Sequence, residues 1–153
     1  MELVRHRGWI RFGLIYLAVT IGLLAVWILV TPKGFYDDFP GGSAHWVSVL
    51  PPYNEHLERD FGAASLGLAV LAALAALWME RRVVQATAIT VLVAGIPHLV
   101  YHATTTDRLS TGDNIGSLTG LALDALLPLA ILYLAGDRAQ GRVRRASLPG
   151  GRA

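Results

Sequence analysis

The chain has 153 residues, of which 54% are hydrophobic and only 16% are charged, a composition too apolar for an ordinary soluble domain of this size. It contains no cysteine, which excludes disulfides, thiolate catalysis, cysteine-ligated zinc and iron–sulfur clusters. Its formal charge is only +2. The sequence has no zinc-finger spacing, no stacking-aromatic motif and no basic helix of the soluble type, so no nucleic-acid partner is expected.

Four apolar stretches are long enough to cross a membrane, since about 20 apolar residues span the ~30 Å hydrocarbon layer. They predict a single integral membrane domain over residues 1–153, an all-α bundle of four transmembrane helices with a long outer loop between helices 1 and 2. A basic tail, residues 137–153, is expected to be disordered. The expected spans are about residues 10–31, 61–79, 83–103 and 115–135.

Basic residues precede the first span, as they do in an export signal. Its apolar core is longer than the 7 to 15 residues that are typical of such signals, so a retained anchor is expected. Cytoplasmic loops retain Lys and Arg, and ten basic residues fall on the side of the two termini. Both termini are therefore expected in the cytoplasm and residues 32–60 outside the plasma membrane. These ten are Arg5, Arg7, Arg11, Arg81, Arg82, Arg138, Arg142, Arg144, Arg145 and Arg152.

The segment 32–60 is unusually aromatic for an exposed connection. A segment of this length without its own structure would be unusual, so it is expected to fold over the outer mouth, with a short helical turn around residues 43–50. The alternative is an interfacial loop anchored by its aromatic side chains. Asn54 is the expected N-cap of the second helix. Three side chains here, His45, Trp46 and Glu55, are candidate ligand contacts, with Tyr101 of the third span.

Small residues recur at four-residue spacing in the second and fourth spans, which permits close helix crossings in lipid. The alternative explanation is that alanine is simply common in helices. The sets are Ala63 with Gly67, then Ser65 with Ala69 and Ala73, and finally Gly116 with Gly120.

Two pairs of candidate metal ligands lie near the outer side. His98 and His102 are four residues apart in the third span, and His56 and Asp60 repeat that spacing at the start of the second, so each pair shares a helical face. Together they form a ligand set suited to a divalent metal, zinc or non-haem iron. The alternative is a histidine pair that forms hydrogen bonds or faces lipid headgroups.

Asp124 lies near the middle of the fourth span, where a carboxylate costs roughly 2.5 to 3.5 kcal/mol. It shares the face of Gly116 and Gly120 and is expected to point into the bundle, with His98 as the nearest ionisable group. The two are candidate catalytic residues for proton transfer. Pro97 and Pro128 are expected to bend their helices and help to open a pocket between them. The structural alternative is a neutral Asp124 bonded to Thr20, Thr90 or a backbone carbonyl.

The basic N-terminus, the proline- and aromatic-containing outer segment, the acidic entrance to a small-residue helix at residues 56–62 and two further spans together resemble the DoxX-like group of small four-helix membrane proteins. The resemblance covers roughly residues 8–136 and is architectural. It implies a quinone-related or redox accessory role, although the cysteines of some redox members are missing here. It assigns no catalytic residue to this chain.

Two functional hypotheses follow. The first is a small membrane protein whose outward-facing His/Asp pocket binds a small or lipophilic ligand, with acid/base or metal-assisted catalysis as its candidate chemistry. The second is a non-catalytic accessory subunit of a redox or transport complex in the membrane, whose small-residue faces pack against a partner subunit or a second copy of the chain. Membrane lipids are expected partners in both.

Overall fold

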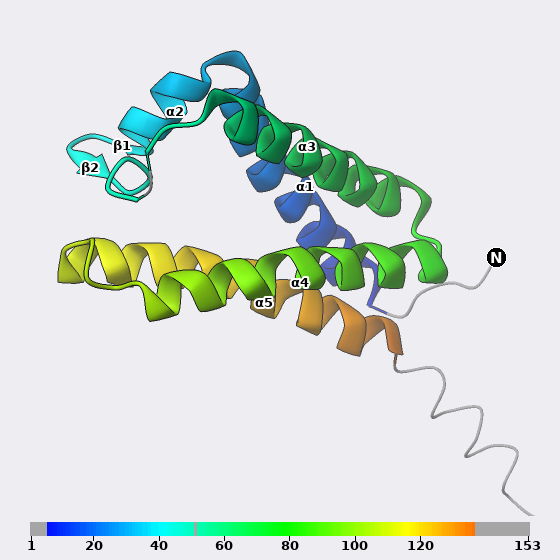
Figure 1. Cartoon of the computed structure of the whole chain (residues 1–153). Coiled ribbons are helices and arrows are strands. Elements are labelled where there is room, and N and C mark those ends of the chain that lie inside the picture. Colours follow the sequence, from blue (N-terminus) through cyan, green and yellow to red (C-terminus); the bar gives the residue numbers. More distant parts are fainter. Residues whose placement is uncertain (1–5, 51, 137–153) are drawn as a thin grey trace, which may run out of the picture.

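A computed structural model describes residues 6–50 and 52–136 and shows an all-α protein with four long helices (Figure 1). All four are long and apolar enough to cross a membrane, as the sequence predicts. Each of these helices begins a few residues before the apolar stretch predicted from the sequence. The reason is that helical structure extends over the residues that precede each stretch. The tail 137–153 lies outside the described residues. The long helices are α1 (Arg7–Val30), α3 (Glu55–Trp78), α4 (Arg81–Thr104) and α5 (Thr111–Gly136).

The connection between α1 and α3 contains secondary structure of its own, as expected of a segment of this length, but a helix and a hairpin take up part of the long loop predicted there. Helix α2 (Pro32–Asp38) follows α1 at once, with Pro32 at a helix-initiating position. Strands β1 (Pro40–Gly41) and β2 (Ala44–His45) then pair antiparallel, Pro40 opposite His45. The helical turn expected at 43–50 is therefore wrong, because the hairpin occupies its first part and a turn the rest. We call residues 31–54 the connector.

Asn54 caps α3 as predicted, since its side-chain oxygen accepts a hydrogen bond from the Leu57 amide at 3.2 Å. Helix α3 ends at Trp78, and α4 starts at Arg81 after only two residues. In this turn Met79 adopts a left-handed backbone conformation and is buried. Helices α4 and α5 run unbroken through Pro97 and Pro128.

The long helices associate in two pairs, α1 with α3 and α4 with α5. The first pair packs through small residues, because Gly62, Ser65 and Ala69 are buried on the face of α3 that meets α1. The expected close packing at Ser65 and Ala69 is thus confirmed. The expectation for Ala63 and Gly67 is wrong within this chain, since both are exposed and a Cβ on Gly67 would meet nothing within 4 Å.

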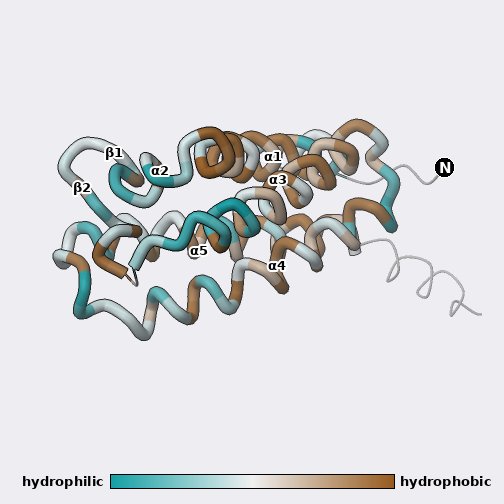
Figure 2. Tube along the Cα trace, turned by 45° about the horizontal axis from the view of Figure 1, so that its top comes forward, coloured by the Kyte–Doolittle hydropathy of each residue, from teal (hydrophilic) through white to brown (hydrophobic). Residues whose placement is uncertain are grey.

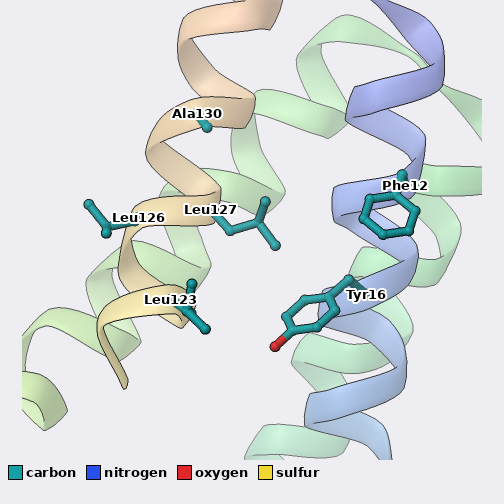
Figure 3. A pocket seen from close by; sticks show the side chains of 6 residues that line it. All are labelled: Phe12, Tyr16, Leu123, Leu126, Leu127 and Ala130. Carbon is teal, nitrogen blue, oxygen red and sulfur yellow. The ribbon is translucent and has the colours of Figure 1, made fainter. Parts of the chain in front are cut away.

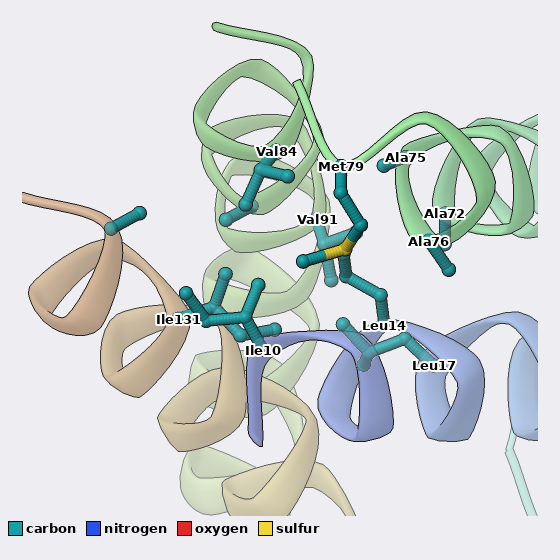
Figure 4. Packing of buried hydrophobic residues seen from close by; sticks show 12 residues of the cluster. Ile10, Leu14, Leu17, Ala72, Ala75, Ala76, Met79, Val84, Val91 and Ile131 are labelled. Carbon is teal, nitrogen blue, oxygen red and sulfur yellow. The ribbon is translucent and has the colours of Figure 1, made fainter. Parts of the chain in front are cut away.

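The two pairs share one hydrophobic core (Figure 4). Its members come from the helix ends that lie together at one end of the molecule. We call this the core end and the opposite one, with α2 and the hairpin, the hairpin end. The pairs diverge toward the hairpin end (Figure 1). The core is built from the start of α1 and α4 and the end of α3 and α5, with Ile10, Leu14, Leu17, Ala72, Ala75, Ala76, Met79, Val84, Ala88, Val91, Ile131 and Ala135 as its members.

Large apolar side chains also cover the outside of the bundle, as expected of a surface that faces lipid. Leu23 and Val93 are each 69% exposed and Tyr133 is 74% exposed. Hydrophobic colours run along the four long helices in Figure 2, whereas the α3–α4 turn is hydrophilic. The chain is therefore described as an integral membrane protein.

We predict that Gly62→Ala destabilises the bundle, whereas the control Gly67→Ala does not. A Cβ at position 62 would lie 2.8 Å from Cγ2 of Ile28, so α1 and α3 must separate, at a cost of ~1–3 kcal/mol. At position 67 the added methyl meets open space and raises helix propensity. The free energy of unfolding in mixed detergent micelles measures both, and equal effects would contradict this packing.

Candidate functional site

Asp124 lies in the middle of α5 and on its inward face. Buried Ser117 is seven residues before it, and buried Pro128 and Ile131 are four and seven residues after it, so all share one side of the helix. Ile131 contacts α1, since a Cβ on Gly13 would lie 3.1 Å from its Cδ1. Half-buried Asp124 therefore faces the interior of the bundle, at the level where the core ends and the helix pairs begin to diverge.

Within residues 6–50 and 52–136, no side chain or backbone group forms a hydrogen bond or ion pair with the Asp124 carboxyl group. The expected partner His98 does not reach it. The structural alternatives fail as well: Thr20 donates to the carbonyl of Tyr16 at 2.9 Å, and Thr90 donates to that of Ala86 at 2.8 Å. Each hydroxyl uses its only proton on its own helix, and neither hydroxyl oxygen accepts a hydrogen bond from the carboxyl group.

His98 and His102 lie together on α4, as the sequence predicts, with ring centroids 4.9 Å apart. They continue the stripe that Val84, Ala88 and Val91 begin in the core. The ring of Phe61 on α3 meets His98 edge-on at 6.2 Å, and Tyr101 meets His102 at 5.5 Å. The sequence analysis missed the role of Phe61, and no local pattern identifies it because the contact joins two helices.

His56 and Asp60 form a pair of their own on α3. The His56 Nε2 and an Asp60 carboxylate oxygen are 3.3 Å apart, with the side chains 87% and 64% exposed. Among the described residues, no three His, Cys, Asp or Glu side chains are grouped so as to hold a metal ion. The four-residue set His56, Asp60, His98 and His102 is thus not assembled, because the two pairs stay on separate helices.

The other candidate contacts make bonds within the chain. The His45 ring nitrogen Nδ1 is 2.6 Å from the Asp37 carbonyl oxygen, which ties the hairpin to α2. Glu55 pairs with Arg59 at 2.8 Å, and Arg59 also donates to the carbonyl of Leu29 on α1. These bonds order the entrance to α3, while Tyr101 stays exposed beside His102.

Trp46 bridges the connector to α5. Its indole N–H donates to the Asp113 carboxylate at 2.8 Å, and its ring lies against Gly116, where an added Cβ would be 3.1 Å from two ring carbons. Ser110 fixes the carboxylate by donating to Asp113 at 2.6 Å, and its oxygen accepts from the Asp113 amide. Ser110 and Asp113 are three residues apart at the start of α5 and resemble a capping box, a pattern that can be recognised in a sequence. The contact between Trp46 and Asp113 joins segments far apart in the chain, so the sequence alone does not predict it.

Aromatic rings hold the connector against α1. Phe35 lies 5.7 Å from Trp27 of α1, Phe39 lies 5.0 Å from Phe35, and Trp46 lies 5.9 Å from Phe39, centroid to centroid. Nearby, Lys33 bonds Asp37, and this carboxylate raises the pKa of the Lys33 ammonium above its usual value. The ring chain thus links α1 through the connector to α5 at the hairpin end.

An apolar groove of about 390 Å³ lies between α1 and α5 and opens to the outside of the bundle (Figure 3). Its Leu127 also contacts α1, 3.2 Å from the position of a Cβ on Gly13. Leu123 immediately precedes Asp124, so the groove and the carboxyl group lie on adjoining faces of the same helix. Its residues are Phe12, Tyr16, Leu123, Leu126, Leu127 and Ala130.

We predict that Trp46→Phe and Asp113→Asn each loosen the hairpin and that their effects are not additive. Both variants weaken one hydrogen bond, for which a coupling energy of ~0.5–1.5 kcal/mol is typical. Hydrogen–deuterium exchange of residues 40–48 should rise in either variant and little further in the double one. Trp9→Phe, at a residue 73% exposed, is the control. Strictly additive effects would show that the two side chains do not interact.

The chain matches no protein-family model, no curated protein and no solved structure. The inward polar face, the bridging connector and the groove beside Asp124 are what point to a function.

Proposed function

We propose that this protein binds a lipophilic small molecule inside the bundle, on the hairpin side of the core, and that Asp124 hydrogen-bonds a polar group of that molecule. The observation that carries the proposal is the position of Asp124: it lies mid-helix and faces inward, and no described residue is its partner. Ionisable side chains in transmembrane segments are rare, and they mark ligand or proton sites.

The position of the hydrophobic core supports this location. Apolar side chains fill the core end, so a ligand has no room there. Beyond the core, the inward stripes of α4 and α5 change from apolar to polar, with His98 on one helix and Asp124 on the other. A ligand between the pairs meets both kinds of group, as small-molecule sites require.

His98 and Asp124 are the candidate proton-transfer groups of this site. Since nothing joins them directly, each would act on a different atom of the ligand, one able to accept a proton and the other to release one. Binding requires only the hydrogen bond to Asp124, so acid/base chemistry is a second step of the proposal. A metal-assisted step finds no assembled ligand set among the described residues.

The hairpin end faces the outside of the plasma membrane in this proposal, with both termini in the cytoplasm. The support is the arginine bias: Arg7, Arg11, Arg81 and Arg82 lie at the core end, whereas the hairpin end is acidic. A ligand from the outer leaflet or the outside would then reach the polar half of the bundle first.

The second candidate function is an accessory subunit, and the exposed small residues of α3 favour it. Ala63 and Gly67 face away from α1 at the spacing that lets another helix approach closely. This arrangement also agrees with the architectural resemblance to the DoxX-like group. Native mass spectrometry from intact membranes would find a stoichiometric partner chain if this candidate is right.

We predict that the purified protein retains a small molecule distinct from bulk phospholipid and that Asp124→Leu loses it. The leucine cannot form the hydrogen bond, and removing a costly mid-membrane carboxyl group should also stabilise the fold by ~2 kcal/mol or more. Native mass spectrometry and solvent extraction of protein in lipid nanodiscs measure occupancy, and detergent denaturation measures stability.

Asp60→Asn is the matched control, because Asp60 is an exposed acid at the end of the same bundle and should leave occupancy unchanged. Two results would each reject the proposal: wild-type protein that carries only bulk phospholipid, or Asp124→Leu protein that keeps the molecule at wild-type occupancy.

A further inference from the structure

The groove between α1 and α5 has features of a site for one long apolar chain. Five of its six residues are purely hydrocarbon, and it opens sideways to the outside of the helices. In a membrane-spanning bundle that outside is the acyl region of the bilayer. A groove of this lining is filled by a hydrocarbon chain rather than by water.

The groove and Asp124 lie on two sides of one seam. Helices α1 and α5 touch toward the core end, where Gly13 meets Leu127 and Ile131. At the hairpin end the connector that follows α1 meets α5 through Trp46, whose ring lies against Gly116. Between these two points, Leu123 lines the groove and Asp124 follows it on the adjoining face of α5.

Tyr16 supplies the only polar atom of the groove. Figure 3 shows its hydroxyl directed toward Leu123 across the seam. Among residues 6–50 and 52–136, none forms a hydrogen bond with this hydroxyl. A hydroxyl in hydrocarbon is costly unless it is bonded, so the Tyr16 hydroxyl is a second group in the groove that a polar part of a ligand would satisfy.

We propose that the ligand is a single-chain amphiphile taken sideways from the bilayer, with its apolar chain in the α1–α5 groove and its hydrogen-bonding head at Asp124. The placement of the polar head at Asp124 rests on the proposed function. The new parts are the binding site for the apolar chain and the chemical class of the ligand. A second copy of the protein fits the groove poorly, because close helix approach needs small residues and the groove is bordered by Phe12, Tyr16 and leucines.

The test uses hexadecanol that carries a photoactivatable diazirine midway along its chain, added to the full-length protein in lipid nanodiscs. After illumination, peptide mass spectrometry locates the adducts. We expect them on the groove residues of α1 and α5, and we expect excess unlabelled hexadecanol to compete more strongly than decanol, because burial scales with chain length.

Ala130→Phe fills the groove and should lower this labelling by about tenfold or more. Leu129→Phe is the matched control, since Leu129 is 50% exposed on α5 but does not line the groove, and it should label as wild type does. Equal labelling of the two variants would overturn the groove as a chain site. A cross-linked protein dimer in place of the adduct would assign the groove to a second copy and also overturn it.

Asp124→Asn separates the two proposals. If Ala130→Phe abolishes groove labelling and Asp124→Asn leaves both labelling and competition unchanged, the chain site stands and the role of Asp124 in the proposed function fails. If Asp124→Asn loses the ligand of the purified protein but Ala130→Phe labels normally, the proposed function stands and the chain site fails.

Discussion

The packing of all four helices at one end of the molecule is the constraint on which the rest of the structure depends. Ile10, Leu14 and Ile131 fill the space where the two helix pairs meet, and the two-residue α3–α4 turn closes that end around buried Met79. No comparable set of large buried side chains joins the pairs at the hairpin end of the described chain. There, Trp46 of the connector meets α5 through its ring and a single hydrogen bond, and the rings of Phe39 and Phe35 join it to α1.

This asymmetry explains where polar groups lie. On α4 the inward stripe is apolar at Val84 and Val91 and polar at His98, and on α5 it is apolar at Ile131 and polar at Asp124. Both changes fall beyond the packed core. A carboxyl or imidazole group inside that core would lose its hydration with no partner, whereas His98 and Asp124 lie outside it and are not fully buried.

Periodicity and length explain why much of the fold is predictable from sequence, and contacts between distant segments explain the rest. Asn54 begins α3 because the cap is a local interaction, and the inward placement of Asp124 follows from helical spacing. Two small-residue stripes on α3 have the same spacing, however. The stripe with Ser65 and Ala69 is buried, rather than the one with Ala63 and Gly67, because it packs against the face of α1 that carries Gly22 and Ile28. Likewise, no local pattern predicts that Trp46 meets Gly116.

The absence of a partner for Asp124 in the described chain also has a physical origin. Thr20, Thr87, Thr90 and Thr119 each donate to the carbonyl four residues earlier, the ordinary way in which a hydroxyl is satisfied in a helix surrounded by lipid. Threonine hydroxyls therefore contribute no donors to the interior. An ionised carboxyl group has no proton to donate in this way, and its charge is costly in hydrocarbon. No described residue bonds the Asp124 carboxyl group, and this is why we place the hydrogen-bonding head of the proposed ligand there.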